Sequence, residues 1–192
     1  MVSAGLGWMW HYSGTAGIQN AAPEVWPAKC TVVPAAGQTT LVVFIHPRCP
    51  CSRATVGEIG WIMAKAKGLV QAQVWFYRPD GEPEAWAHTD LWRSAGQIPG
   101  VSVAGDEGGV EAVRFNASVS GQTLLYDRDG RCVFNGGITS ARGHSGDNAG
   151  RSAVLTLLHG ANLQKVETPV FGCALSGAGS TSAPTPGLRP QS

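Results

Sequence analysis

The chain has 192 residues, of which 43% are hydrophobic and 14% charged, and its formal net charge is +1. This length suits one domain with a substantial core, and the composition is that of a globular protein rather than an unfolded one. The near-neutral charge excludes the broad basic surface of a nucleic-acid-binding protein, so no nucleic-acid partner is expected.

The two ends of the chain differ from its middle. Residues 1–10, MVSAGLGWMW, are apolar and uncharged, and they lack the basic start of a signal peptide. Ten helical residues reach about 15 Å, half of a bilayer core, but the two tryptophans are typical of a membrane interface. We interpret residues 1–37 as an apolar N-terminus and linker. The apolar part is either the remnant of a membrane anchor, giving membrane attachment, or an unstructured end. Residues 176–192 are predicted to be disordered.

Residues 38–175 alternate between apolar runs and helical patterns. Strands are predicted at 41–45, 70–77, 101–103, 123–126 and 131–134, and helices at 50–67, 84–95, 110–115 and 149–159. Asp129-Gly130 between the last two strands is a strong hairpin signal. A βαβ unit followed by a ββα unit predicts one α/β domain with a mixed central sheet and helices on both faces.

Two cysteines, Cys49 and Cys51, stand between the first predicted strand and the first predicted helix. The start of a helix offers unpaired N–H groups and the positive end of the helix dipole, and both favour a thiolate. Arg48 adds a neighbouring positive charge. The sequence therefore predicts that Cys49 is a nucleophile that attacks disulfides, with Cys51 as a candidate resolving thiol.

This order of elements, with a cysteine at the first junction, resembles the thioredoxin-like superfamily, in particular its membrane-anchored thiol–disulfide oxidoreductases. Those proteins carry a Cys-Pro-Pro-Cys-Arg-Ala motif, which Cys49-Pro50 and Arg53-Ala54 match. The stretches HPRCPCSRA, GGITSARGHSGDNAG and TPVFGC are similar to small bacterial RedB-type proteins. The resemblance covers roughly residues 38–160. It implies a thioredoxin-like three-layer fold, protein thiols and disulfides as partners, and an extracytoplasmic, periplasmic location, with the cytoplasm as the alternative.

The motif departs from the family at two places. Ser52 occupies the position of the resolving cysteine, while Cys51 comes one residue early. Gly121 stands where the family has its cis-proline, and we expect glycine to leave this spot open and flexible. Under the redox interpretation the catalytic residues are Cys49, Cys51, Arg48, Ser52 and Gly121, and no cofactor is expected.

Two other functions remain open. Cys49 and Cys51, with His46 and His144 as further ligands, would form a soft site suited to copper or zinc. Alternatively, the fold binds a partner without catalysis, through its seven tryptophans and its long glycine-rich loop.

The other cysteines carry three expectations. Cys132 is predicted to be a small core residue. Cys30 and Cys173 flank the domain and could pair in an oxidising compartment. Alternatively, Cys173 could reach the active face as a resolving thiol.

Overall fold

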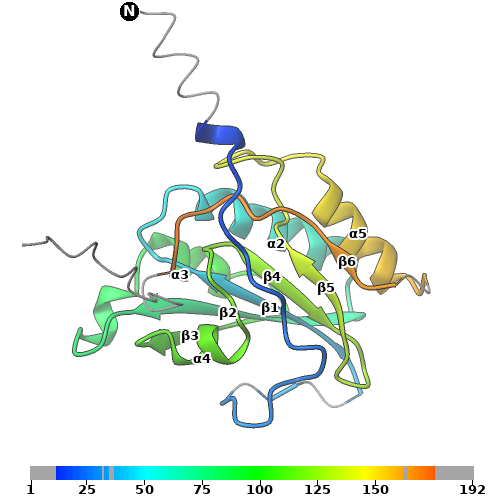
Figure 1. Ribbon diagram of the computed structural model, residues 1–192, viewed down its shortest axis with the longest axis horizontal. Coiled ribbons are helices and arrows are strands. Elements are labelled where there is room, and N and C mark those ends of the chain that lie inside the picture. Colours follow the sequence, from blue (N-terminus) through cyan, green and yellow to red (C-terminus); the bar gives the residue numbers. More distant parts are fainter. Residues whose placement is uncertain (1–11, 32, 35–36, 162–163, 176–192) are drawn as a thin grey trace, which may run out of the picture.

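The computed structural model describes residues 12–31, 33–34, 37–161 and 164–175. Within these ranges one mixed sheet runs in the order β3-β2-β1-β4-β5-β6. Its strands are β1 (Thr39–Ile45), β2 (Val70–Arg78), β3 (Val101–Glu107), β4 (Gln122–Tyr126), β5 (Cys132–Gly136) and β6 (Val166–Glu167). The helices are α2 (Ser52–Lys65), the 3-10 turn η1 (Glu84–Trp86), α3 (Asp90–Gly96), α4 (Val110–Arg114) and α5 (Ala149–Leu158). The predicted α/β class, with a mixed central sheet, is confirmed (Figure 1).

Strand β1 lies in the middle of the sheet, parallel to β2 and antiparallel to β4. Its alternate side chains enter two separate clusters: Leu41, Val43 and Ile45 pack on one face, and Val42 and Phe44 on the other. A strand that is apolar on both faces must be covered on both. The end of β1 is therefore fixed in the core, and it holds the cysteines that follow.

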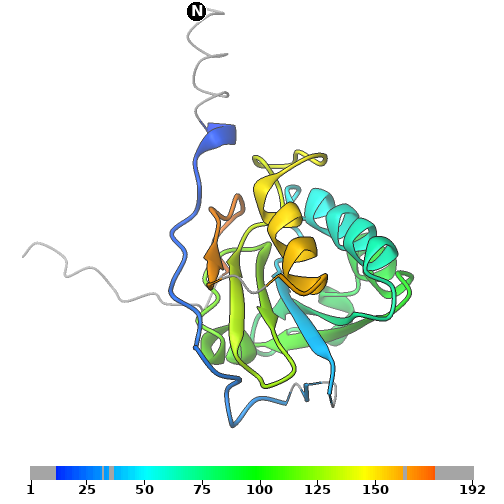
Figure 2. The same ribbon diagram turned by 90° about the vertical axis from the view of Figure 1, so that its right-hand side faces the viewer.

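Helices cover the two faces unequally. The cluster on one face contains side chains of α2, α3 and α5, and the cluster on the other contains side chains of α4 and of the N-terminal segment, residues 12–31. Figure 2 shows α2 and α5 on one side of the sheet and the N-terminal segment running down the other. The predicted three layers are present.

The N-terminal segment contributes to the core, although the sequence suggested a linker. Ala22 is buried, and the Tyr126 hydroxyl donates to the Pro23 carbonyl oxygen at 3.1 Å. Trp26 packs edge-on against Phe115 and Tyr126. The domain boundary at residues 37 and 38 stays a prediction, but the residues before it help to cover the sheet.

One predicted helix is wrong in its bounds. The stretch 84–95 is not one helix but η1 followed by α3. The break falls at Thr89, whose backbone is extended (φ −77°, ψ −178°) and whose hydroxyl donates to the Pro47 carbonyl oxygen at 3.4 Å. Threonine is common at a helix N-cap, but the Thr89 side chain makes no capping hydrogen bond here.

No helix among the described residues is long and apolar enough to cross a membrane. The anchor interpretation rests on residues 1–10, which lie outside the described ranges. The prediction of disorder at 176–192 also falls outside them.

Candidate functional site

Cys49 lies in the turn that joins β1 to α2. Its backbone N–H donates to the His46 carbonyl oxygen at 3.0 Å, and the Ser52 N–H donates to the Cys49 carbonyl oxygen at 3.1 Å. Helix α2 begins at Ser52, two residues later than predicted. Cys49 is thus at a strand-to-helix junction, as expected, but its residue is only 2% exposed.

The sulfur of Cys49 lies 3.1 Å from the sulfur of Cys173, a residue 124 positions later in the chain. A covalent disulfide is about 2.05 Å long, so a shift of about 1 Å would bring the two thiols to bonding distance. The structure therefore brings Cys173 to the active face, which was one of the two alternatives for this cysteine. The alternative pairing of Cys173 with Cys30 is not the one that the fold assembles.

The segment that carries Cys173 is fixed against the loop before β4. The Ser120 N–H donates to the Cys173 carbonyl oxygen at 2.8 Å, and the Leu175 N–H donates to the Ser118 carbonyl oxygen at 2.9 Å. A Cβ added to Gly172 would stand 1.8 Å from the Ser120 carbonyl oxygen, so only glycine fits at this crossing. This close approach sets the position of the neighbouring sulfur.

Hydrogen bonds favour the thiolate form of Cys49. Burial alone would raise the pKa of this thiol, but it is outweighed. The Cys173 thiol and backbone, the Ser52 hydroxyl and the Cys51 backbone all hydrogen-bond to the Cys49 sulfur, and together they lower its pKa below the ordinary value of 9.0. Donors that bind the charged form lower the pKa of an acid. Cys49 is therefore the more easily ionised thiol of the pair.

Two serines link the Cys49 sulfur by hydrogen bonds to the backbone that follows β1. The His46 N–H donates to the Ser120 hydroxyl oxygen at 2.8 Å, and the Ser120 and Ser52 hydroxyl oxygens lie 2.9 Å apart in a buried contact. Because Ser120 already accepts a bond from the backbone, it can donate its own proton to Ser52. The Ser52 proton is then directed to the Cys49 sulfur. Ser52, at the family's cysteine position, acts here as a hydrogen-bond donor.

Cys51 also lies close to the pair. It hydrogen-bonds to Cys49, and its pKa is raised by burial and by the charge of the Cys49 thiolate. Arg142 opposes this rise through its charge and a hydrogen bond. The site is thus a group of three thiols, Cys49, Cys51 and Cys173, with one guanidinium beside them.

Arg142 lies in the loop between β5 and α5. Its guanidinium donates to the Gly172 carbonyl oxygen at 2.6 Å and covers the Tyr12 ring at 4.7 Å. Its Nε is buried without a hydrogen-bond partner among the described residues. This arginine therefore ties the loop to the segment of Cys173 and places positive charge there. The sequence reasoning missed it, because a loop arginine gives no local signal of the thiols that it will face.

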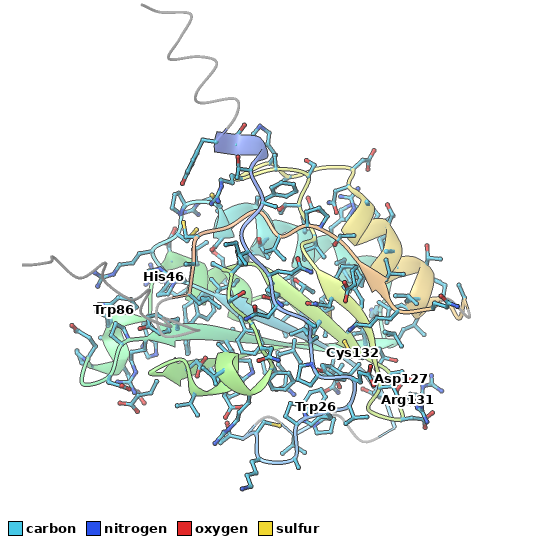
Figure 3. All side chains as sticks on the ribbon, in the orientation of Figure 1. Trp26, His46, Trp86, Asp127, Arg131 and Cys132 are labelled. Atoms are coloured by element: carbon cyan, nitrogen blue, oxygen red, sulfur yellow. The ribbon has the colours of Figure 1, made fainter. Side chains whose placement is uncertain are left out.

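Arg48 and His46 belong to an aromatic group beside the cysteines. The Arg48 guanidinium lies 4.2 Å from the centre of the Trp86 ring. The His46 ring stacks on Tyr77 at 5.7 Å and meets the edge of Trp86. Figure 3 shows His46 and Trp86 in the same part of the molecule. Burial and the Arg48 charge lower the pKa of His46. Arg48 is thus held on Trp86, whereas the groups that lower the pKa of Cys49 are hydrogen-bond donors.

Gly121 does not leave an open space, which corrects the expectation. It is buried, and a Cβ at this position would lie 3.0 Å from the Thr55 hydroxyl. Its φ is +92°, and its N–H donates to the Phe44 carbonyl oxygen at 2.7 Å. Proline could provide neither that torsion nor that donor. The loop is therefore built for glycine, and Thr55 fills the space beside it.

Of the four predicted metal ligands, Cys49 and Cys51 lie together, whereas the two histidines make other contacts. His144 is exposed, and its Nδ1 contacts the Arg142 carbonyl oxygen at 2.9 Å. Nδ1 of His46 accepts the Arg48 N–H at 3.2 Å. Within residues 12–31, 33–34, 37–161 and 164–175, no three His, Cys, Asp or Glu side chains are grouped as a metal site would require. Copper or zinc binding stays a prediction.

The other two cysteines lie away from this site. Cys132 is buried at the start of β5, as predicted, and burial raises its pKa to about 11. The Trp26 indole donates to the Cys30 sulfur at 2.9 Å, and burial raises the pKa of that thiol as well. Figure 3 shows Cys132 beside the β4–β5 turn, apart from His46. Both are suited to packing.

A buried ion pair holds the long loop over the site. Glu58 of α2 accepts the Gly146 N–H at 2.7 Å and pairs with Arg151 of α5 at 2.8 Å. Arg151 also pairs with Asp147, and its guanidinium covers the Trp61 ring at 4.0 Å. These contacts join α2, α5 and the loop that carries Arg142, so they position the arginine indirectly. The sequence predicted this loop but not its anchor.

Comparisons with known proteins identify the fold only. No family model matches the chain, and no curated protein matches it. A hypothetical protein of Sinorhizobium meliloti 1021 superposes with a TM-score of 0.61 at 21% identity, covering 81% of this chain and 95% of that one. An uncharacterized conserved protein from Geobacillus kaustophilus gives a TM-score of 0.59 at 18% identity, covering 84% and 92%.

A more distant likeness is to a secreted Mycobacterium tuberculosis disulfide oxidoreductase homologous to E. coli DsbE. The TM-score is 0.46 at 15% identity, with coverage of 65% of this chain and 82% of that one. At such identities the first two structures share an architecture with this chain and say nothing about its site. The chemistry must therefore be argued from the thiols themselves.

Proposed function

We propose that the protein is a thiol–disulfide oxidoreductase whose redox pair is Cys49 and Cys173. The observation that carries the proposal is the 3.1 Å separation of their two sulfurs, maintained across 124 residues of chain. Cys49 has the lowered pKa that a nucleophilic thiol needs, and Cys173 is held in reach by the Gly172 crossing. This assignment makes Cys173, rather than Cys51, the redox partner of Cys49.

The reaction is a two-electron exchange with protein thiols. In the reduced protein, Cys49 and Cys173 are thiols, and a partner disulfide accepts their two electrons and leaves as two thiols. The Cys173 thiolate first bonds to one sulfur of the partner disulfide, and the other partner sulfur leaves as a thiolate. In the closing step, the Cys49 thiolate attacks this mixed disulfide at the Cys173 sulfur. The bond from Cys173 to the partner breaks, the Cys49–Cys173 bond forms, and the partner leaves as a thiolate.

Cys51 is the alternative partner for Cys49. It lies in the same turn and hydrogen-bonds to Cys49. A disulfide between cysteines two residues apart closes a very small ring, and such a ring is strained. Ser52, at the family's resolving position, contributes its hydroxyl to thiolate stabilisation. We therefore assign Cys51 an auxiliary role.

The test is a map of the disulfide and of its reactivity. The purified protein is equilibrated in glutathione buffers of graded redox ratio, alkylated, digested without reductant and analysed by mass spectrometry. We expect a peptide pair joined through Cys49 and Cys173 whose amount follows the redox ratio. A pair joined through Cys49 and Cys51, or no disulfide at any ratio, would contradict the proposal.

Three matched variants separate the roles. Cys49→Ser and Cys173→Ser should abolish the oxidation of a dithiol peptide by the oxidised protein, because each removes one half of the pair. Cys51→Ser should retain most of that activity, and Cys132→Ser should resemble the unaltered protein. Loss of activity in Cys51→Ser alone would restore the CPC interpretation.

We further propose an extracytoplasmic site of action, because a protein disulfide persists in oxidising compartments. The resemblance of the motif around Cys49 to membrane-anchored oxidoreductases and to RedB-type proteins supports this location. Cell fractionation with a protease-protection assay tests it: recovery of the protein in the cytosolic fraction only would contradict it.

A further inference from the structure

The two sulfurs of the pair differ in their access to solvent. Cys49 is only 2% exposed, whereas Cys173 is partly exposed. A hollow of about 520 Å³ borders Cys173 but not Cys49. A smaller hollow of about 220 Å³ borders Cys49 but not Cys173, and the two share no residue. Each hollow therefore borders one residue of the pair, and the larger one borders the more exposed residue, Cys173.

The larger hollow is shaped by the N-terminal segment and the segment of Cys173. Its lining is Tyr12, Gly17, Ile18, Asn20, Ser118, Val119, Arg142, Gly172, Cys173 and Ala174. Most of this lining is uncharged, and Arg142 supplies one cation beside the sulfur. Such a surface suits an uncharged peptide segment that carries a cysteine, because the guanidinium attracts the thiolate of that cysteine.

We propose that, in the oxidised protein, an incoming substrate thiolate attacks the sulfur of Cys173 through the larger hollow and expels Cys49 as the leaving thiolate. The substrate class is a reduced dithiol in an extended peptide or protein segment. This inference rests on the proposed Cys49–Cys173 pair, and it adds the entry point and the direction of the exchange.

The steps balance. The substrate sulfur bonds to Cys173, the Cys49–Cys173 bond breaks, and Cys49 leaves with the electron pair. The second substrate thiolate then attacks the first substrate sulfur and expels Cys173 as a thiolate, which takes up a proton from water. The substrate dithiol has lost two electrons and become a disulfide, and the pair has gained them. A low-molecular-weight disulfide, such as oxidised glutathione, returns the pair to the oxidised state.

The electrostatics of the two sulfurs agree with this order. Burial and the nearby Cys49 and Cys51 thiols raise the pKa of Cys173 to about 11, while hydrogen bonds lower that of Cys49. The thiol with the lower pKa leaves faster. The donors from Ser52 and from the backbone are already in place when the charge develops on Cys49, so expulsion of this sulfur needs no rearrangement of them.

The decisive experiment locates the mixed disulfide. The full chain with Cys51→Ser is oxidised, and formation of the Cys49–Cys173 disulfide is verified before any thiol is added. If that disulfide is missing at this stage, the proposed function fails. The oxidised protein is then mixed briefly with reduced glutathione, quenched with excess N-ethylmaleimide and mapped by mass spectrometry.

We expect glutathione on Cys173 and maleimide on Cys49, in about tenfold excess over the reverse pattern, since access and leaving-group pKa both favour it. Glutathione mainly on Cys49, or in equal amounts on both, would overturn the entry point while leaving the redox pair intact.

Two exposed positions give an independent measurement. Ile18, 89% exposed, lines the larger hollow, and Arg53, whose side chain is 67% exposed, lines the smaller one. Ile18→Trp should slow reduction of the disulfide by glutathione several-fold, and Arg53→Trp should leave the rate unchanged. Slowing by Arg53→Trp alone, or equal rates in both variants, would count against entry at Cys173.

Discussion

Ser52 shows how a single residue changes the meaning of a motif. Counted along the chain it replaces a resolving cysteine, which would suggest a disabled active site. In the fold, its hydroxyl faces the Cys49 sulfur and is supported by Ser120 at 2.9 Å. A donor in this position stabilises the thiolate. Under the proposed function, Ser52 therefore stabilises the Cys49 thiolate, and Cys173 supplies the second sulfur of the pair.

The first prediction concerns this hydroxyl. In Ser52→Ala the Cys49 thiolate loses one donor, so the pKa of Cys49 rises and its alkylation profile moves to higher pH. We expect a shift of about one pH unit, because a hydrogen bond to a charged group contributes about 1.5 kcal/mol and one unit corresponds to about 1.36 kcal/mol. The rate of iodoacetamide labelling of Cys49 between pH 5 and 10 measures it (roughly the range over which thiols ionise).

The exposed serine Ser152 of α5 provides the control, because its alanine variant should leave the profile unchanged. The alkylation profile of Cys49 in Ser52→Ala is expected to move to higher pH. The pKa of Cys49 is lowered in the folded protein, so the unaltered protein reacts at lower pH than a free thiol. An unchanged profile in Ser52→Ala would show that the backbone donors alone hold the thiolate.

At the scale of elements, the segment that carries Cys173 is as important as the helix that follows Cys49. A glycine makes its crossing with the loop before β4 possible, since a Cβ at Gly172 would meet the Ser120 carbonyl oxygen at 1.8 Å. Backbone cannot move aside as a flexible side chain can. Gly172→Ala must therefore lift the segment and carry Cys173 away from Cys49.

We expect Gly172→Ala to slow formation of the Cys49–Cys173 disulfide by about ten- to a hundredfold, because a displacement of about 1 Å between reacting groups costs this much. Oxidation by glutathione followed by quantitative alkylation measures the rate. Gly105→Ala in β3 is the matched control, because a Cβ there meets nothing within 4 Å. Equal rates in the two variants would mean that the crossing does not position the sulfur.

Two helical glycines make opposite predictions about stability. Gly150 in α5 lies against the backbone just after β5, where a Cβ would be 1.9 Å from the Gly137 carbonyl oxygen. A Cβ at Gly57 in α2 meets only the Ser145 hydroxyl, at 3.8 Å. Gly150→Ala should lower the free energy of unfolding by about 1–3 kcal/mol through overpacking. Gly57→Ala should raise it by about 0.5–1 kcal/mol, because alanine favours the helix. Urea denaturation measures both, and a common sign would refute the packing argument.

For the whole molecule, features that depend on residues close in sequence could be predicted, and features that depend on residues far apart in sequence could not. The five apolar residues of β1, the Asp129-Gly130 turn and the junction at Cys49 depend on neighbours in sequence, and their predictions agree with the structure. The contact of Cys49 with Cys173 spans 124 residues and has no local signal, so the sequence could only offer it as one alternative.

The need for distant contacts also explains why Gly121 was misjudged and Arg142 was missed. Gly121 was placed by alignment with a proline, but its surroundings depend on Thr55, which packs against it from α2. Arg142 reaches the site because a buried Glu58–Arg151 pair fixes its loop. Neither arrangement could be read from spacing, because each needs two distant elements to be packed first.

The long separation of the pair gives a prediction for the whole fold. A disulfide between Cys49 and Cys173 closes a loop of more than a hundred residues, and the chain-entropy estimate for such a loop is about 4–5 kcal/mol. The gain should be smaller than this, because oxidation removes the hydrogen-bonded Cys49 thiolate that favours the reduced fold. We therefore expect the oxidised protein to unfold at a higher urea concentration than the reduced protein.

The variant Cys51→Ser distinguishes a Cys49–Cys173 disulfide from a Cys49–Cys51 disulfide. A disulfide between Cys49 and Cys51 would close a loop of about three residues, which barely restricts the unfolded chain. If Cys49 pairs with Cys173, the difference in unfolding free energy between oxidised and reduced protein persists in Cys51→Ser and disappears in Cys173→Ser. If oxidation leaves the unfolding free energy of the unaltered protein and of Cys51→Ser unchanged, the segment that carries Cys173 is not covalently joined to Cys49, which contradicts the proposed pair.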